Sequence, residues 1–241
     1  MKKTDNIEVT SFKDAIYIST KYEKYRTSLI GESVYILGEG EKIEDQFTAT
    51  EKDFLLPIVN LCDDLIESKI ISEPGPGSFA KAVFDADCHA KIIEWCNTFG
   101  LPFPTSQAAV VRCKATNANY PAFSVEDFIV QAFRIHSMFY KWQKGITTDT
   151  YLFDCNGCIL YSLFNDNGKP AMILIFPDAF SLARVQLALT ALNPTTAYRF
   201  VMRCKMCGKW FFGQGNARFC QDPCTRQDFY KKKKKEVGVK A

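Results

Sequence analysis

Four cysteines near the end of the sequence constrain its fold more than any other feature. They form two pairs, Cys204 with Cys207 and Cys220 with Cys224. Two cysteines that enclose only two residues can bind one ion from a tight turn, and four thiolates make the tetrahedral site that structural zinc prefers. The short, polar segment around them needs a metal or disulfides to fold. The spacing therefore predicts a Zn²⁺ site with the ligands Cys204, Cys207, Cys220 and Cys224.

The residues between the two pairs predict a tight turn and a hairpin. Gly208 follows the first pair directly and lets the backbone make the turn around Cys204 and Cys207, which we call the knuckle. Residues 210–212 and 217–219 flank a glycine-rich stretch, which is the pattern of two short strands joined by a turn. We therefore expect a small hairpin between the cysteine pairs.

The second pair is expected to begin a helix. Asp222 can accept hydrogen bonds as the N-cap, Pro223 suits the first helical position, and Cys224 then lies in the first turn, facing the ion. Knuckle, hairpin and helix together make a treble-clef-like finger. Two alternatives remain for the same thiols, namely burial as small hydrophobic residues in a reducing cytosol, or two disulfides.

The finger resembles that of a known family. The stretches RCKMCGKWF and RFC, followed by Cys224 and basic residues, resemble the C-terminal finger of the bacterial CGNR-type zinc-finger proteins. In that family the finger follows an α-rich domain called ABATE, and the proteins are regarded as stress-related transcription regulators. The family's Cys-Gly-Asn-Arg signature reads Cys-Thr-Arg-Gln from Cys224 here, which also fits a sister family of the same architecture. The resemblance implies that the four cysteines bind zinc and that the finger contacts DNA.

Charge is distributed unevenly along the chain. From residue 199 onward, twelve lysines and arginines face three acidic residues, a net charge of +9. Subtraction from the whole-chain charge of +3 leaves about −6 for residues 1–198. A basic cluster on a small module is typical of a polyanion-binding protein, because each neutralised phosphate releases counterions.

Nucleic acid is therefore the first candidate partner, and DNA is favoured over RNA. Lysines supply affinity without sequence choice, whereas arginines can make bidentate contacts with guanine. The alternative is a solvated, frayed helix that only aids solubility. The candidate nucleic-acid-binding residues are Arg218, Arg226, Lys231, Lys232, Lys233, Lys234 and Lys235.

Composition indicates a cytoplasmic protein without a membrane span. The first residues include no apolar leader, and ten cysteines without that leader argue against a secreted disulfide framework. No run reaches about 18 uninterrupted apolar residues. Residues 1–198 are rich enough in hydrophobic side chains to bury a core.

The pattern predicts an α+β fold, with a helix-dominated domain over residues 1–198 that contains a β-meander, followed by the finger and a basic C-terminal helix over residues 199–241. An internal linker is expected at residues 73–78, which are rich in proline and glycine. Helices are expected at 51–70 capped by Thr50, 87–99 ending at Gly100, 124–144 capped by Ser124, and 179–192 capped by Asp178. Strands are expected at 15–19, 33–37, 151–153, 158–164 and 170–176, with turns at 38–40, 156–157 and 167–168.

Other chemistry-bearing residues have ordinary structural interpretations. Cys155 and Cys158 enclose an Asn-Gly turn, so they most simply face each other in a hairpin, although a redox or metal role stays open. His89 and His136 are interpreted as helix residues rather than as part of a Cys–His catalytic pair. We find no catalytic motif and expect no enzyme, with the N-terminal domain left open.

Two functions follow from these features. In the first, the finger binds DNA and the N-terminal domain senses a small molecule or a protein partner, as in a transcription regulator. In the second, the finger binds protein or RNA and the N-terminal domain has an unrelated, possibly enzymatic, function. The sequence does not indicate an oligomeric state.

Overall fold

The computed structural model divides the chain into two compact units, residues 1–187 and residues 188–241. Residue 198, the predicted domain boundary, lies outside the described residues. The structure describes residues 15–48, 53–72, 74–103, 109–113, 118–146, 159–164, 170–192, 200–214, 216–221 and 223–225.

A long two-stranded ribbon forms the middle of the first unit's sheet. Strands β1 (Ala15–Ile30) and β2 (Ser33–Thr48) pair antiparallel along nearly their whole length. They are joined by a two-residue turn that begins at Gly31, whose φ of 62° is left-handed and suits glycine. Both strands are much longer than the short runs that the sequence predicts.

The predicted turn at residues 38–40 is wrong, because these residues lie inside β2. They face the point in β1, between Tyr22 and Lys24, where the register shifts. The ring of Tyr22 fills the space that a Cβ of Gly38 would occupy, and Gly40 adopts a φ of 88°. The two glycines therefore serve a bulge and a close cross-strand approach rather than a chain reversal.

The remaining strands extend the ribbon into one six-stranded sheet with the order β3-β4-β2-β1-β6-β5. Strands β5 (Ile159–Phe164) and β6 (Pro170–Ile175) pair antiparallel, as the sequence predicts. Strand β6 also runs parallel to the start of β1, so the pair belongs to the main sheet. The predicted strand at 151–153 lies outside the described residues. Strands β3 (Ala109–Cys113) and β4 (Ala118–Ser124) complete the other edge, next to β2.

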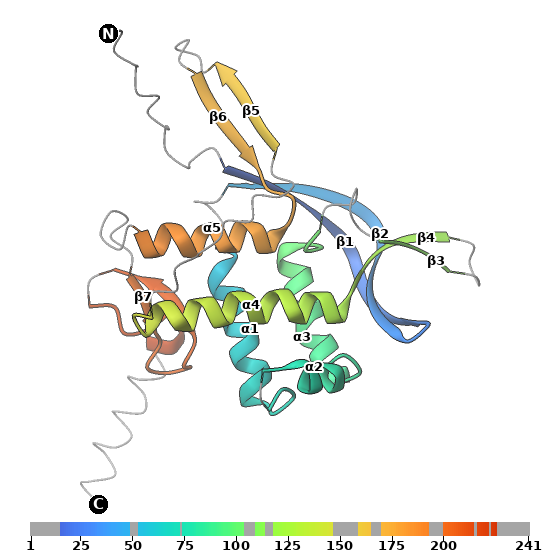
Figure 1. The fold of residues 1–241 in the computed structure, drawn as a ribbon, viewed down its shortest axis with the longest axis horizontal. Coiled ribbons are helices and arrows are strands. Elements are labelled where there is room, and N and C mark those ends of the chain that lie inside the picture. Colours follow the sequence, from blue (N-terminus) through green and yellow to red (C-terminus); the bar gives the residue numbers. More distant parts are fainter. Residues whose placement is uncertain are drawn as a thin grey trace, which may run out of the picture. The chain divides into compact units, whose positions relative to one another are not determined.

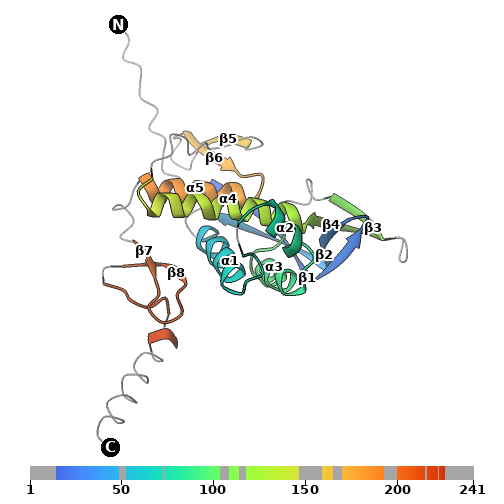
Figure 2. The same ribbon diagram turned by 60° about the horizontal axis from the view of Figure 1, so that its bottom comes forward.

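Helices cover the concave side of the curved ribbon, as Figures 1 and 2 show. Helix α3 packs on β1, and α4 packs on both β2 and α1. The mixed α+β class is thus confirmed, with a continuous sheet as its frame. The helices that accompany this sheet are α1 (Leu55–Glu67), α2 (Pro76–Ala82), α3 (Ala86–Phe99), α4 (Val125–Gln143) and α5 (Ala179–Leu192).

Three helix ends have the predicted local signals. The Ser124 hydroxyl accepts a hydrogen bond from the Asp127 N–H at 3.3 Å, which caps α4. The Asp178 carboxylate accepts one from the Ser181 N–H at 2.7 Å at the start of α5. Helix α3 ends at Gly100, whose φ is 83° and which leaves no room for a side chain beside β1.

The segment predicted as an internal linker, residues 73–78, contains the beginning of a helix. Pro76 occupies the first turn of α2, a position where its missing N–H costs nothing. Phe79 of α2 then packs against Phe133 of α4, with ring centroids 5.1 Å apart. These proline and glycine residues therefore precede and begin a short helix, α2, which packs against α4.

Helix α1 begins at Leu55, so the predicted start at residue 51 is wrong; Thr50, its predicted cap, lies outside the described residues. Phe54 is the N-cap and offers no side-chain cap. A distant side chain does this instead, since Gln186 Oε1 of α5 accepts hydrogen bonds from the N–H groups of Phe54 at 2.9 Å and Leu55 at 3.1 Å. Asp53 Oδ1 accepts a third, from the Leu56 N–H. The first turn of α1 is thus satisfied mainly by tertiary contact.

Aromatic side chains form the centre of the first unit's core. The ring of Phe128 on α4 lies 5.4 Å from Trp95 of α3, 5.3 Å from Phe180 of α5 and 5.7 Å from Phe123 of β4. The contacts with Trp95 and Phe180 are edge-to-face, a geometry that adds to the burial of large apolar rings. The aromatic excess of the sequence is therefore used to join three helices to the sheet.

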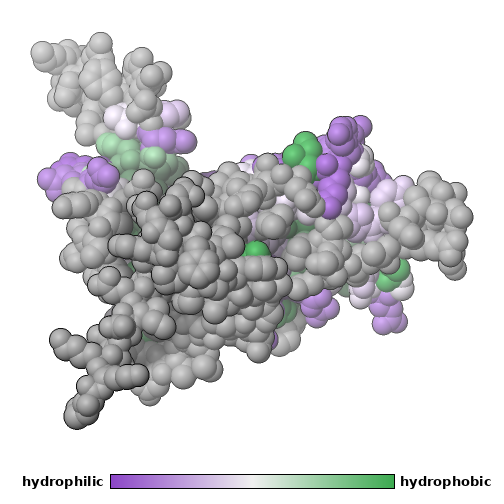
Figure 3. All heavy atoms as spheres, turned by 90° about the horizontal axis from the view of Figure 1, so that it is seen from above, coloured by the Kyte–Doolittle hydropathy of each residue, from purple (hydrophilic) through white to green (hydrophobic). Residues whose placement is uncertain are grey.

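The surface of the described residues has only scattered apolar side chains. Figure 3 shows some of them on one face as separate patches. Leu29 and Phe84 are the most exposed of the large ones, at 64% and 60%, and isolated positions of this kind are ordinary. None of the described helices combines the length and the apolar character that crossing a bilayer requires.

We expect Gln186→Ala to lower the free energy of unfolding of the first unit by about 2–4 kcal/mol. Its removal leaves two N–H groups without an acceptor at a buried helix end. Urea denaturation followed by circular dichroism measures this change. Gln143→Ala, at an exposed position near the end of α4, is the matched control and should shift stability by no more than about 0.5 kcal/mol. Equal effects in the two variants would show that the Gln186 cap contributes nothing.

Candidate metal centre

The first cysteine pair sits at the tip of a hairpin in the second unit. Strand β7 (Phe200–Arg203) leads into the pair and β8 (Trp210–Gly213) leads away from it, and the two strands pair antiparallel. The predicted hairpin between the two pairs is therefore wrong, because residues 217–219 form no strand. The knuckle is itself the turn of the observed hairpin, because the strands that a short turn joins pair most easily.

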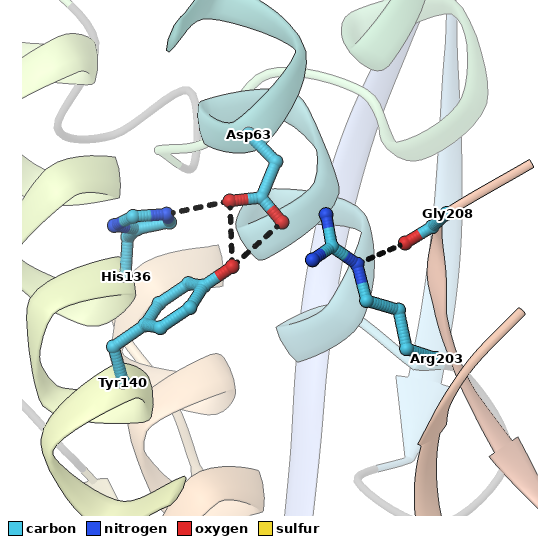
Figure 4. Close-up of polar contacts among 5 residues, drawn as sticks. All are labelled: Asp63, His136, Tyr140, Arg203 and Gly208. Carbon is cyan, nitrogen blue, oxygen red and sulfur yellow. Dashed lines mark hydrogen bonds and ion pairs between the residues drawn. The ribbon is translucent and has the colours of Figure 1, made fainter. Parts of the chain in front are cut away.

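Backbone hydrogen bonds hold the knuckle closed. The Gly208 N–H donates to the Cys204 carbonyl at 2.9 Å, and the Cys204 N–H donates to the Lys209 carbonyl at 2.8 Å. Gly208 has a φ of 75°, as expected for the residue that lets the chain turn. The Arg203 Nε also donates to the Gly208 carbonyl, at 2.7 Å (Figure 4). These bonds direct Cys204 and Cys207 to the same side of the turn.

The second pair is brought to the knuckle by an irregular segment and a helical turn. The Lys205 N–H donates to the Arg218 carbonyl at 3.0 Å, which docks the chain just before Cys220 against the knuckle. Residues 223–225 are helical, and the Thr225 N–H donates to the Gln221 carbonyl at 3.3 Å. Cys224 thus lies in the first turn of a helix, as predicted, whereas Asp222, its predicted cap, lies outside the described residues.

The four sulfur atoms form one compact cluster. All of them lie within 4.8 Å of one another. The Sγ of Cys220 lies 3.6 Å from that of Cys207 and 3.6 Å from that of Cys224. A tetrahedral site with Zn–S bonds of about 2.3 Å has sulfur atoms about 3.8 Å apart, so the observed spacing suits such an ion. The cluster can hold a metal with Cys204, Cys207, Cys220 and Cys224 as ligands.

The electrostatics of the cluster also favour a cation. Burial opposes ionisation of Cys204, but hydrogen bonds from the backbone N–H groups of Cys207, Met206 and Cys220 outweigh it and lower the pKa of this thiol to about 6. Burial and hydrogen bonds to the neighbouring thiols raise the pKa of Cys220 well above its usual range. A second thiolate thus forms less readily than the first, and a bound cation would favour ionisation of all four thiols.

The cluster has the chemistry of a structural site. Four sulfur ligands in tetrahedral arrangement suit Zn²⁺ or iron–sulfur centres and leave no open position for a substrate. A bound ion would tie together the hairpin, the segment that carries Cys220 and the helical turn. Its contribution would be folding energy for the finger rather than catalysis.

The other cysteines and histidines whose side chains the structure describes do not join this cluster. Cys62, Cys88 and Cys96 are buried in the first unit, while Cys155 and Cys158 lie outside the described residues. Next to Cys88, the ring nitrogen Nε2 of His89 lies 2.6 Å from the carbonyl oxygen of Val83. Burial raises the pKa of Cys88 to about 12, so its thiol is a poor nucleophile.

His136 belongs to a polar cluster that sequence reasoning missed. Its Nε2 lies 2.9 Å from Asp63 Oδ1, and the Tyr140 hydroxyl donates to both oxygens of the same carboxylate at 2.9 and 3.0 Å (Figure 4). His136 and Tyr140 are four residues apart on α4, so they share a helix face. This spacing was the sequence signal that could have predicted the cluster. The cluster connects α4 to α1 within the first unit.

Only one of the predicted nucleic-acid-binding residues lies in the described part of the finger. Arg218 is exposed there, whereas Arg226 and the five lysines Lys231 to Lys235 lie outside the described residues. Lys205 and Lys209, which the sequence prediction did not include, are also exposed, on the knuckle and just after it. Lys205 lies between the two cysteines of the knuckle and Lys209 follows Gly208 directly, and these positions were the signal.

Comparison with known proteins identifies no relative. No family model matches the chain, and no curated protein or solved structure matches it significantly. The resemblance to CGNR-type proteins stays a prediction, and the residues of the finger themselves are the basis for assigning a function.

We expect about one equivalent of metal per chain in protein purified without chelator, with zinc as the predicted element. Cys207→Ser should lose this metal and unfold the finger but leave the first unit folded, because ligation supplies the folding energy of the finger only. Elemental analysis and circular dichroism of both proteins provide the measurement. Less than about 0.3 equivalents in the unmodified chain would contradict the site.

The double variant Cys155→Ser, Cys158→Ser is the control. Both residues are interpreted as hairpin positions, so metal content should not change, and the cost in stability should be about 1–3 kcal/mol. A loss of metal in this variant would instead assign these cysteines to a metal site.

Proposed function

We propose that this protein binds nucleic acid through a zinc-stabilised finger and acts as a DNA-binding regulator. In this proposal the four-cysteine cluster holds Zn²⁺, and the finger with its basic C-terminal segment contacts DNA. The first unit senses a small molecule or a protein partner. This is the function that the resemblance to CGNR-type zinc-finger proteins implies.

One observation carries the proposal, namely the gathering of cations around the knuckle. Lys205 and Arg218 are both exposed, and a backbone hydrogen bond of 3.0 Å holds their main chains side by side. Lys209 is exposed four residues after Lys205 on the same turn. A rigid turn therefore presents several positive charges together, which matches the closely spaced phosphates of a nucleic acid.

The charge of the rest of the second unit agrees with this surface. The segment from residue 199 onward has a net charge of +9, and five of its positive charges are the consecutive lysines from Lys231 to Lys235. The preceding residues have a net charge of about −6, so the attraction for a polyanion is confined to the finger and its basic C-terminal segment. The lysines would supply affinity, while Arg218 and Arg226 would read base edges.

We expect the affinity for duplex DNA to fall with salt, with a slope of log affinity against log salt of roughly −4 to −5. This value corresponds to four to six phosphates neutralised at one time. Truncation after Tyr230 should remove most of the slope, because it deletes the five lysines. Fluorescence anisotropy at several salt concentrations measures it. A full chain that binds neither DNA nor RNA at low salt would refute the proposal and favour a protein-binding finger.

A matched pair of variants tests the knuckle itself. Lys205→Ala with Arg218→Ala removes two charges from the finger, and Lys81→Ala with Lys144→Ala removes two exposed charges from the first unit. Only the finger pair should reduce the slope, by about 2 at most. Equal effects would mean that net charge alone governs binding.

We expect Arg226→Ala to reduce discrimination between DNA sequences more than overall affinity. An arginine that makes two hydrogen bonds with guanine contributes about 1–3 kcal/mol of discrimination. The measurement is a selection of bound sequences from a random pool, followed by titration of the best and a scrambled site. Arg226→Lys is the informative companion, because it keeps the charge and loses the bidentate geometry. An unchanged preference in both variants would remove Arg226 from sequence readout.

A further inference from the structure

One face of the β7–β8 hairpin combines an aromatic ring with a guanidinium group. Cross-strand pairing places Arg203 opposite Trp210 and Val201 opposite Phe212. Successive residues of a strand point to opposite faces of the hairpin, so these two pairs share one face, and the pair between them, which contains Met202, lies on the other. The guanidinium carbon of Arg203 lies 5.8 Å from the centroid of the Trp210 ring, within the range of a cation–π contact. Arg203 is exposed, and Trp210 and Phe212 are only partly buried.

The guanidinium group is held in place by a further contact. Arg203 Nε donates to the Gly208 carbonyl at 2.7 Å, so the knuckle orients the side chain that covers the ring. The exposed Lys205 and Lys209 follow on the same turn, and the exposed Arg218 is attached to it through Lys205. A flat aromatic and cationic surface therefore adjoins a group of positive charges.

This combination differs from what duplex DNA requires. Bases in a duplex are stacked on one another, and their faces are closed to a protein side chain. Unpaired bases expose both faces and stack on tryptophan rings or guanidinium planes, while nearby cations follow the phosphates. Duplex recognition through the grooves would use the cations alone and would leave a partly buried tryptophan without a role in binding.

We propose that the finger binds single-stranded nucleic acid, with an unpaired base stacked on the Trp210–Arg203 face and the phosphates along Lys205, Lys209 and Arg218. This inference rests on the proposed nucleic-acid-binding function and adds the strandedness of the ligand. Stacking tolerates any base, so the Trp210 contact itself contributes affinity rather than sequence choice. DNA and RNA single strands share this chemistry.

The test compares a 12-nucleotide single strand with a duplex of the same length, using the full-length metal-bound protein. We expect tighter binding of the single strand, and a loss of roughly 5- to 150-fold in its affinity on Trp210→Ala. The slope against salt should not change, because the variant removes no charge. Phe84→Ala, an exposed aromatic residue of the first unit, is the control and should have no effect.

A pair of variants distinguishes the loss of base stacking from unfolding of the finger. Trp210→Phe keeps an aromatic ring and Trp210→Leu keeps only apolar bulk, and metal content reports whether each finger is folded. Stacking requires that the Phe variant bind the single strand more tightly than the Leu variant. In a Trp142→Phe background only Trp95, which is buried, and Trp210 remain of the three tryptophans, so quenching by the oligonucleotide should come from Trp210.

The outcomes separate the two proposals. Equal binding of duplex and single strand, with no difference between the Phe and Leu variants, would overturn the stacking face and leave nucleic-acid binding intact. Failure to bind either ligand at low salt would refute the proposed function itself. Titrations with oligo(dT) and oligo(U) then show whether the single-stranded ligand is DNA or RNA. A protein that contacts only bases and phosphates binds both, whereas one that contacts the 2′-hydroxyl prefers RNA.

Discussion

The finger brings four cysteine sulfur atoms close together, and a cation among them would stabilise all four as thiolates. The thiols lie within 4.8 Å of one another and come from three pieces of backbone, namely a hairpin tip, an irregular segment and a helical turn. A two-stranded hairpin is marginal by itself, and the unit has little apolar surface to bury. Metal ligation would therefore join three local structures into one surface, and the knuckle hydrogen bonds hold two of the four candidate ligands in place.

The first unit is stabilised in a different way, by aromatic burial and a few polar contacts between distant segments. Phe128 joins residues of α3, α5 and β4, and Gln186 caps a helix whose N-cap is 132 residues away in sequence. The Asp63–His136 contact links α1 to α4 across 73 residues. None of these contacts involves the cysteine cluster, so the two units can respond separately to loss of the metal or to mutation of the core.

Features that depend on neighbouring residues could be predicted from the sequence, and those that depend on tertiary contacts could not. The caps at Ser124 and Asp178 and the end of α3 at Gly100 follow from local chemistry, as does the grouping of Cys204 with Cys207. Gly38 and Gly40 suggested a turn because glycine is common in turns, yet a tyrosine ring on the facing strand and a bulge within β2 are the reasons for them. The hairpin of the finger was misplaced for a similar reason. Strand β8 pairs with β7, which precedes the knuckle, and not with the residues that follow β8.

The arrangement of the finger separates two contributions to nucleic-acid binding. Counterion release by a run of lysines requires no fixed geometry, so this affinity does not depend on a folded finger. Lys205 and Arg218 are 13 residues apart in sequence and lie side by side only while the segment before Cys220 is docked on the knuckle. The Trp210–Arg203 face likewise requires the closed turn that orients the guanidinium group. The metal would thus add no positive charge, because Zn²⁺ with four thiolates has a net charge of about −2, and it would instead determine whether the finger can distinguish one nucleic acid from another.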